Sequence, residues 1–221
     1  MTLYSYCLRW DDGAAPNPFW GVCTLAICKP AIRRVANVGD WVVGLGSSAS
    51  RIGDLSGQAI YVMRVSQRLS MHEYDVFCRD SLRGKIPNWT SRYFKKRVGD
   101  CIYDYSASEP RIRRGVHTDR NREVDLRGEN ALLSDHFYYF GNKPRRLPDY
   151  LLPIVQQTQG HKSRANVPYE SSFVNWIHSL KLQPTKLYGD PIDKWKIMDV
   201  PNATALCSTD DCEADSCDEI C

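Results

Sequence analysis

Residues 25–44, LAICKPAIRRVANVGDWVVG, carry the pattern on which the predicted fold depends. The apolar run that ends at Cys28 predicts a short buried strand, and Pro30 suits the first position of a short helix. The pair Gly39-Asp40 ends this helix in a turn, because glycine accepts a positive φ and aspartate caps the turn. The apolar segment WVVGL at 41–45 then predicts a second core strand.

Further elements follow on both sides of this stretch. Residues 58–69 predict a long strand that is apolar on both faces, which is typical of the centre of a sheet. A capping-box sequence at 70–73, SMHE, predicts the start of a helix. The apolar spacing of i, i+3, i+4 and i+7 over 173–180 predicts an amphipathic helix. Other expected strands lie at 3–10, 101–105 and 131–141, and another helix begins at Pro148.

This order of elements predicts the fold class. Strands and helices do not alternate regularly, as they would in a doubly wound fold. We therefore expect an α+β domain with a mixed, curled sheet of about six strands and with peripheral helices.

Length and composition exclude several classes of protein. The chain has 221 residues, which predicts one large domain or one domain with appendages. Apolar residues make up 43%, enough for a core, so a fully disordered chain is excluded. No apolar run approaches the roughly 18 residues of a membrane-spanning helix. The first residues lack the pattern of a secretory signal, so we expect a cytoplasmic protein with no membrane partner.

The net charge of +3 conceals an uneven distribution. Residues 207–221 contain six acidic side chains and no Lys or Arg, so the rest of the chain carries a net charge of +9. Residues 83–122 contain eleven basic and four acidic side chains. Such a cluster is either a solvated basic face or a contact surface for nucleic acid or a nucleotide.

Nine cysteines fall into two groups. Five lie in apolar segments, where they are most simply small buried hydrophobic residues. The other four are spaced C-x4-C-x4-C-x3-C in the acidic tail, which is either a metal site or a disordered segment. The first group is Cys7, Cys23, Cys28, Cys78 and Cys101, and the second is Cys207, Cys212, Cys217 and Cys221.

Several segments in their order resemble the PUA-like superfamily, especially its EVE and ASCH branches. They are LYSYCLRW, GVCTLAICKPAIRRVANVGDWVVGLGSS, QAIYVMRVSQRLSMHEYD, DHFYYFG and RRLPDYL. More closely, LAICKPAIRRVANVGDWVVG together with DHFYYFG resembles the nucleotide modification associated domain, type 2. The resemblance implies a partly open β-barrel and an association with DNA base modification and phage-conflict systems.

The resemblance also implies a division of the chain. It covers residues 1–182 and departs from EVE domains in a basic insert at about 80–130. Residues 183–206 are then an irregular C-terminal extension, and residues 207–221 are the acidic tail.

Aromatic side chains near strand ends are candidates for stacking on a base. By the resemblance, Trp41 and Ser47 correspond in position to strands that build the cage of EVE-like domains. Because tryptophan is usually mostly buried, the alternative is that Trp41 is simply a core residue. Together the candidate base-binding residues are Trp10, Trp20, Trp41, Ser47 and Tyr139.

Polar residues on predicted loops form a candidate rim around the ligand. The pair His117 and Asp119 is also an H-x-D motif, as in facial-triad iron sites, with His161 or His178 as the distal ligand. The rim comprises His117, Asp119, Asn121, His161 and Lys162, and the candidate phosphate contacts are Lys95, Lys96 and Arg97. A plain exposed loop is the alternative for this segment.

Nucleophilic motifs are weak in the sequence. Cys23 and Cys28 lie in apolar runs without a sequence-adjacent base, and neither G-x-S-x-G nor H-E-x-x-H occurs. We therefore expect a module without a cofactor that binds nucleic acid or a nucleotide. The alternatives are a metal-dependent enzyme of base modification that uses the H-x-D motif, and an interaction protein without a ligand. The oligomeric state stays open.

Overall fold

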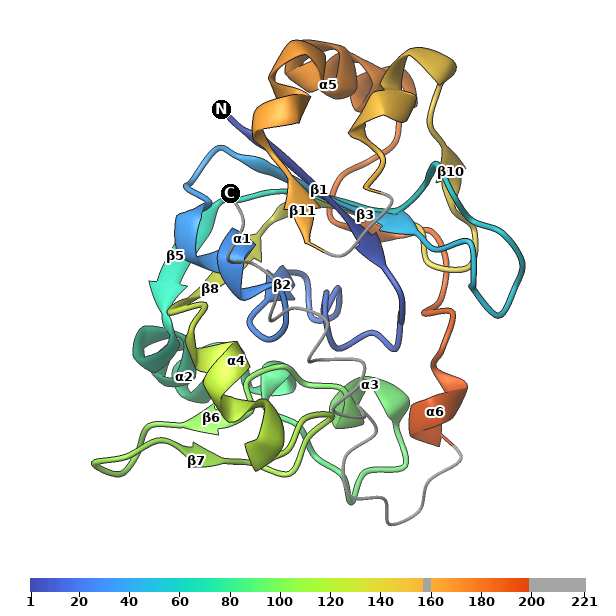
Figure 1. Cartoon of the computed structure of the whole chain (residues 1–221). Coiled ribbons are helices and arrows are strands. Elements are labelled where there is room, and N and C mark those ends of the chain that lie inside the picture. The colour runs from blue at the N-terminus through green and yellow to red at the C-terminus, as the bar shows by residue number, and fades with distance from the viewer. Residues whose placement is uncertain (157–159, 199–221) are drawn as a thin grey trace.

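A mixed sheet of seven strands forms the centre of the computed structural model, which describes residues 1–156 and 160–198 (Figure 1). Its strand order is β11-β1-β3-β4-β9-β12, and β10 pairs with β4. The parallel pairs are β1 with β3 and β9 with β12, whereas the other pairs are antiparallel. The strands are β1 (Leu3–Leu8), β3 (Trp41–Gly46), β4 (Gln58–Arg64), β9 (His136–Tyr139), β10 (Arg145–Arg146), β11 (His161–Lys162) and β12 (Lys186–Leu187).

A second sheet of three strands, in the order β2-β8-β5, continues from the first. The chain passes from β4 into β5 and from β8 into β9 with only a short break, and Ser66 N–H donates to Leu133 O at 2.9 Å beside it. The strands are β2 (Cys23–Leu25), β5 (Gln67–Ser70) and β8 (Asn130–Ser134); β6 (Tyr103–Asp104) and β7 (Arg111–Ile112) form a separate pair.

These pairings confirm the α+β class and the mixed sheet, but the prediction of a curled sheet or partly open barrel is wrong. Within the described part of the chain, the strands form no closed or curled barrel. The reason is that β11 and β12 end the sheet on opposite sides, while β8 pairs with β2 and β5 in a separate sheet.

Local sequence signals place the helices. Pro30 begins α1 (Pro30–Val35), and Ser70 and Glu73 form the expected capping box of α2 (Met71–Asp80). The amphipathic segment forms α5 (Glu170–Ser179), whereas the segment after Pro148 is a 3₁₀ helix (Asp149–Ile154). The remaining α-helices are α3 (Phe94–Arg97), α4 (Arg122–Leu126) and α6 (Trp195–Met198), and 3₁₀ turns lie at Arg83–Lys85, Asp119–Asn121 and Arg164–Tyr169.

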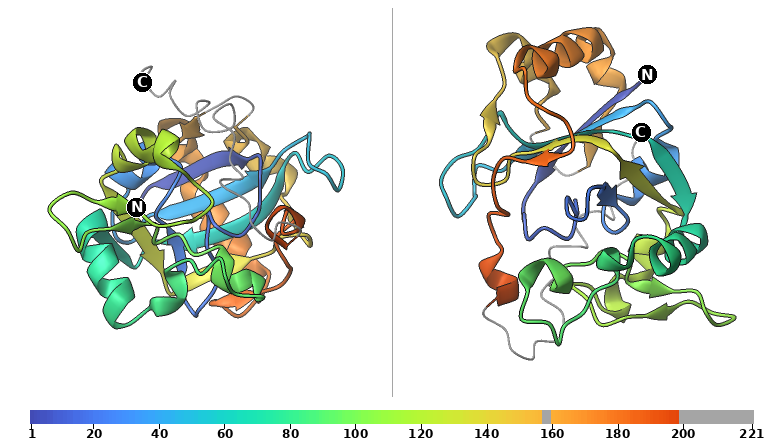
Figure 2. Two further views of the ribbon diagram at one scale, coloured as in Figure 1. Left: turned by 90° about the horizontal axis from the view of Figure 1, so that it is seen from below. Right: turned by 180° about the vertical axis from the view of Figure 1, so that it is seen from behind.

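The two faces of the central sheet bury different clusters. On one face, Val43 and Val62 pack with Phe173 and Ile177 of α5. On the other face, side chains including Tyr61 join the cluster beneath the sheet. Figure 2 shows α5 and the region of β2 and α2 on opposite sides of this sheet. Because both faces are covered, β4 is the central strand that its apolar sequence predicts.

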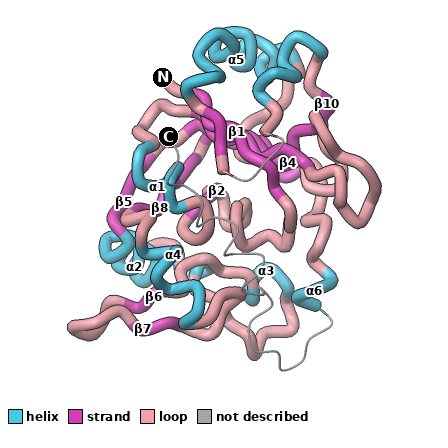
Figure 3. The backbone as a smooth tube through the Cα atoms, in the orientation of Figure 1, coloured by secondary structure: helices cyan, strands magenta, loops and turns pink. Residues whose placement is uncertain are grey.

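The segment expected as a basic insert, residues 80–130, is rich in loops but has a buried core. Figure 3 shows it as long turns with short elements below the sheet. Its Val98, Ile102 and Val116 are at most 2% exposed and join a cluster with Ile27 from the loop after β2. This packing fixes the insert against the loop that precedes α1.

Residues 183–198 lie against the sheet, through β12 and through a hydrogen bond from Asp193 N–H to Asp11 O at 2.8 Å. The predicted domain boundaries are not tested by these contacts and stay a prediction. The acidic tail at 207–221 lies outside the described residues. No helix in residues 1–156 and 160–198 is long and apolar enough to cross a bilayer.

Candidate active site

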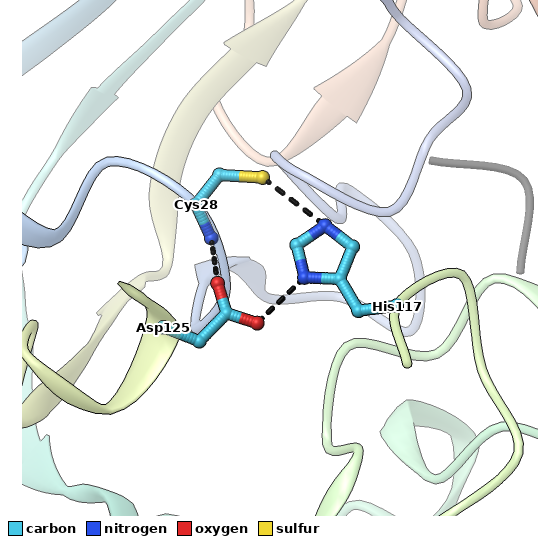
Figure 4. Close-up of side chains that lie close together, drawn as sticks. All are labelled: Cys28, His117 and Asp125. Atoms are coloured by element: carbon cyan, nitrogen blue, oxygen red, sulfur yellow. Dashed lines mark hydrogen bonds and ion pairs between the residues drawn. The ribbon is translucent and has the colours of Figure 1, made fainter. Parts of the chain in front are cut away.

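Three side chains from distant parts of the sequence meet where the insert contacts the loop before α1 (Figure 4). The Cys28 Sγ lies 3.5 Å from Nε2 of His117, and Nδ1 of His117 lies 2.6 Å from Oδ2 of Asp125. Cys28 is half-buried, whereas His117 and Asp125 are 4% and 1% exposed. A thiol, an imidazole and a carboxylate in this order form the arrangement of a nucleophile, a base and an orienting group.

The thiol is carried on a sharp connection between β2 and α1. Cys28 and Lys29 have φ angles of 57° and 44°. Both lie in the left-handed region, which residues other than glycine rarely adopt. Pro30 begins the helix directly afterwards. Strained backbone of this kind persists where surrounding contacts fix it, and it gathers at functional sites.

Arg33 is the buried residue that fixes this connection. Its side chain is 0% exposed, and its guanidinium donates to the carbonyl oxygens of Cys28 at 2.7 Å and Ala26 at 2.8 Å. It also donates to the carbonyl oxygens of Asn130, at 2.9 Å, and Asp125. One cation therefore connects the backbone of the thiol residue to the backbone of the acid.

The Asp125 carboxylate has hydrogen-bond donors on both oxygens. Oδ1 accepts from the Cys28 backbone N–H at 2.9 Å, and Oδ2 accepts from the Tyr103 hydroxyl at 2.9 Å as well as from His117. Burial alone raises the pKa of this carboxyl, but His117, Arg33 and the Cys28 N–H together hold its pKa below the ordinary value. Asp125 is therefore ionised at neutral pH.

An ionised Asp125 determines the tautomer of His117. A carboxylate can only accept hydrogen bonds, so the proton of neutral His117 lies on Nδ1. Nε2 is then the acceptor that faces the Cys28 thiol. Burial and the Asp125 charge raise the pKa of the Tyr103 phenol, which keeps that hydroxyl a donor.

The other described cysteines have different surroundings. Cys23, Cys78 and Cys101 are at most 2% exposed. Burial raises the pKa of Cys23 to about 12, so its thiol stays protonated. Cys7 is half-buried and serves as a comparison for Cys28.

Of the polar residues expected to form a rim, only His117 belongs to this arrangement. The side chain of Asp119 is 73% exposed, and its Oδ1 lies 3.7 Å from Nε of Arg122. Asn121 is 2% exposed, and its Oδ1 accepts from Thr118 N–H in a capping box. The other two expected rim residues, His161 and Lys162, lie on the edge strand β11.

The described residues do not gather the expected H-x-D metal set. In that part of the chain, the one group of three or more His, Cys, Asp or Glu residues with ligand atoms within 4.8 Å of one another is Cys28, His117 and Asp125. His161 packs against Tyr4, with ring centroids 5.8 Å apart, and His178 packs against Trp41. The four tail cysteines lie outside the described residues.

The candidate base-binding residues fall into two groups. Trp41 and Tyr139 are 3% and 0% exposed, and Trp41 contacts Phe173 edge to face with centroids 6.3 Å apart. Trp10 and Trp20 are each 40% exposed. Ser47 is half-buried at the end of β3 beside a pocket. Their role in stacking on a base stays a prediction.

The candidate phosphate contacts lie together on α3. Lys95 and Lys96 are exposed, whereas Arg97 is half-buried and donates to Ser91 O at 2.5 Å and Ile197 O at 3.2 Å. Lys95 and Lys96 therefore present charge to solvent, and their contact with phosphate stays a prediction.

Neither Cys28 nor Asp125 is among the site residues that the sequence predicts. The thiol residue is 89 positions from His117 and 97 positions from Asp125, so no local motif joins them. The single local signal is a cysteine at a strand-to-helix junction, directly before Lys-Pro.

Comparisons with known proteins give one match. A family model described as nucleotide modification associated domain 2 matches residues 1–199, which include all three residues of this site. Searches of curated proteins and of solved structures each found no match.

Proposed function

Because the chain belongs to the nucleotide modification associated domain 2 family, we propose that it is a cysteine-dependent enzyme that acts on a nucleotide or on a base in nucleic acid. The observation that carries this proposal is the alignment of Cys28 Sγ, the His117 imidazole and the Asp125 carboxylate at 3.5 Å and 2.6 Å. We propose Cys28 as the nucleophile, His117 as the general base and Asp125 as the group that orients it.

The reaction class that suits this set is acyl transfer. His117 accepts the thiol proton at Nε2, and Cys28 Sγ forms a bond to the carbonyl carbon of an acyl donor. The bond from that carbon to its leaving group breaks, and His117 returns the proton to the leaving group. An amine or water then attacks the carbonyl carbon of the thioester, and His117 takes the proton of the attacking group. The bond from that carbon to Sγ breaks, and His117 returns the proton to the Cys28 thiolate.

A metal centre built from the same three residues is the alternative. The contacts of Asp125 favour the nucleophilic set, since both of its oxygens already accept hydrogen bonds from the protein. In a metal site, a carboxylate oxygen of Asp125 and a ring nitrogen of His117 would instead point at the ion. We therefore propose the orienting role for Asp125.

Recognition of a base is the second part of the proposal. The indoles of Trp10 and Trp20 are each 40% exposed, and the Lys196 ammonium covers one face of Trp10, 2.9 Å from its ring centroid. Their remaining exposed faces are the candidate stacking surfaces, and Lys95 and Lys96 offer charge for phosphate. A role in DNA base modification and phage conflict, and a place in the PUA-like superfamily, are proposals of the same kind that rest on the sequence resemblance. A binding module without catalysis is the competing function, and it is favoured if the thiol proves inert.

The test is to incubate the full chain with p-nitrophenyl acetate and to locate the acetyl group by peptide mass spectrometry. We expect a rapid burst of p-nitrophenolate and a thioester on Cys28. His117→Gln should slow the burst by roughly 10²–10⁴-fold, the contribution of a general base. Cys7→Ser is the matched control and should leave the burst unchanged.

Two results would contradict the enzymatic proposal. One is acetylation of Cys28 no faster than that of Cys7. The other is stoichiometric zinc or iron in the purified protein that is lost in Cys28→Ser, since this would assign the three residues to a metal.

A further inference from the structure

The connection that leads into β2 carries an exposed tryptophan at its tip. Asn17 N–H donates to Thr24 O at 2.8 Å, and Thr24 N–H donates to Asn17 O at 2.9 Å, so the two ends of the connection pair as in a hairpin. Trp20 lies between them and is 40% exposed. Single exposed apolar side chains are common on protein surfaces, but the contacts that hold this one are not.

A buried lysine fixes the connection in place. Lys85 is 0% exposed, and its ammonium group donates to Asn17 O at 2.7 Å, Asn17 Oδ1 at 2.8 Å and Val22 O at 2.7 Å. These acceptors use all three donors of the ammonium group. The Asn17 Nδ2 donates in turn to Val98 O at 2.7 Å. Because a buried cation is tolerated only when it is fully hydrogen-bonded, these contacts give the connection one defined conformation.

The backbone at the tip is strained. Trp20 has a φ of 69° and Gly21 a φ of 79°. Glycine adopts such values readily, but a bulky side chain in the left-handed region is an outlier. Strain of this kind persists where the surrounding structure imposes it, and it gathers at functional sites.

The indole of Trp20 lies flat on Gly84, in the 3₁₀ turn Arg83–Lys85. A Cβ at Gly84 would lie within 3.0 Å of Cγ, Cδ2 and Cε2 of the indole, nearly equidistant from all three. These atoms belong to one ring, so the face of the ring, and not its edge, covers the glycine. The exposed 40% of Trp20 therefore belongs to the opposite face and the edges. The outer face is a flat surface held in a fixed position, as stacking on a base requires.

Cations lie beside this surface. Residues 81–99 contain six basic side chains and no acidic one. Arg83 is exposed and directly precedes the glycine beneath the indole. The Lys95 Nζ lies 5.4 Å from the ring centroid of Phe19, the residue before Trp20. A stacking surface with cations from two different elements matches a base that has phosphates on both sides, as in a polynucleotide strand.

We propose that the outer face of Trp20, with Arg83 and Lys95 beside it, binds one base of a single-stranded nucleic acid and the phosphates next to that base. A duplex is disfavoured because each base face is already covered by its neighbours. The proposal rests on the function proposed above and narrows its substrate class to a single strand. Trp20 and Cys28 lie on the two sides of β2, eight residues apart, which is at most about 29 Å of chain. One short strand can therefore contact both.

The test is the binding of fluorescein-labelled strands to the full chain, measured by fluorescence anisotropy. Oligothymidine and oligouridine of about 12 nucleotides are compared with a duplex of the same length and with thymidine triphosphate as an unlabelled competitor. We expect at least one single strand to bind roughly 10-fold or more tightly than the duplex and the triphosphate. Cys28→Ala should bind like the parent, so failure of the catalytic proposal does not affect this measurement.

Two variants test the stacking surface. Trp20→Ala should weaken single-strand binding by roughly 5- to 150-fold, the effect of one base–aromatic stack. Gly84→Ala keeps the tryptophan but displaces its indole, so it should weaken binding as well. Tyr150→Ala is the control and should bind like the parent. Tyr150 is 58% exposed, and its neighbour Leu151 packs with α5 on the other side of the central sheet.

The salt dependence separates stacking from charge. Lys95→Gln should lower the slope of log affinity against log salt concentration by about 0.7, the value for one phosphate contact on a single strand. Trp20→Ala should leave that slope unchanged, because it removes no charge. Melting temperatures show that each variant is folded.

Three results would overturn the inference. The first is that neither single strand binds more tightly than the duplex. The second is that Trp20→Ala and Gly84→Ala both bind like the parent. The third is a dimer of the parent that Trp20→Ala dissociates, which would assign the indole to a contact between two copies of the chain.

Discussion

The backbone N–H of Cys28 donates a hydrogen bond to the carboxylate of Asp125 across 2.9 Å. The same carboxylate binds His117, so the position of the thiol residue and the orientation of the imidazole depend on one acid. This connection joins the loop before α1 to the insert and makes the geometry of the site sensitive to single substitutions.

Asp125→Asn should slow acetylation of Cys28 by p-nitrophenyl acetate by roughly 10²-fold or more. The amide can present an N–H to Nδ1 of His117, which favours the tautomer with its proton on Nε2 and removes the acceptor that faces the thiol. The rate is followed by the release of p-nitrophenolate. Glu123→Gln, an exposed acid on the same helix, is the control and should react like the parent. Equal rates for Asp125→Asn and the parent would refute the orienting role.

Arg33→Met should lower the free energy of unfolding by roughly 3–5 kcal/mol, because it leaves several buried carbonyl oxygens without a donor. Those oxygens belong to Ala26, Cys28, Asp125 and Asn130. Urea denaturation measures the loss. Arg34→Met, at the adjacent exposed position, should change stability by less than about 0.5 kcal/mol. A similar small effect at both positions would show that Arg33 does not fix the connection.

Cys28→Gly should be more stable than Cys28→Ala by about 0.5–1 kcal/mol. At most positions a protein with alanine is more stable than one with glycine. At a φ of 57°, however, the Cβ of any side chain is sterically unfavourable. Both variants lack the thiol, so the comparison isolates the backbone. Thermal and urea unfolding of the pair measure the difference, and the usual order, with alanine more stable, would indicate an unstrained backbone at Cys28.

The stability of the parent should fall, relative to that of Asp11→Asn, as pH rises from about 4 to about 7. Burial raises the pKa of Asp11 from 3.8 to about 7 despite the hydrogen bond from Tyr139, so the folded state binds its proton more tightly than the unfolded state. The contribution of protonated Asp11 to the free energy of unfolding is complete below pH 3.8, and it is lost as the pH rises through about 7. Urea titrations across that range test the sign, and a parallel pH profile for the two proteins would contradict it.

Trp41→Ala should lower the free energy of unfolding by roughly 3–5 kcal/mol, the usual cost of truncating a buried aromatic side chain. Trp41 is 3% exposed, whereas Trp20 is 40% exposed, so Trp20→Ala should cost much less. Melting temperatures and oligonucleotide affinities are measured for both. If Trp41→Ala weakens binding while its melting temperature holds, Trp41 stacks on a base as the sequence analysis proposed.

Local signals predicted much of the fold. The proline at the start of α1, the capping box at Ser70 and the apolar spacing of α5 each act within a few residues, and the structure confirms all three. The apolar pattern of β4 likewise predicted a central strand. The prediction of a barrel was wrong because it depended on which strands pair. The pairing of β5 and β8 with each other, outside the central sheet, cannot be read from a local sequence pattern.

The candidate active site could be predicted only in part. His117 attracted notice as half of an H-x-D motif, but Asp119 points to solvent and the acid that binds His117 is Asp125. Cys28 lies in an apolar run like those of the buried cysteines. Its left-handed backbone could not be predicted either, because neither glycine nor asparagine occupies that position. Only the packing of residues 80–130 onto the loop before α1 brings the three together.

The most direct test of the central claim is the rate at which iodoacetamide alkylates each cysteine of the full chain at pH 7, resolved by peptide mass spectrometry. We predict that Cys28 reacts faster than Cys7, although both are half-buried. We also predict that His117→Gln removes this difference in rate while the protein stays folded, as its melting temperature shows. Alkylation of Cys28 at the rate of Cys7 in the parent, or at an unchanged rate in His117→Gln, would contradict the assignment of Cys28 as an activated nucleophile.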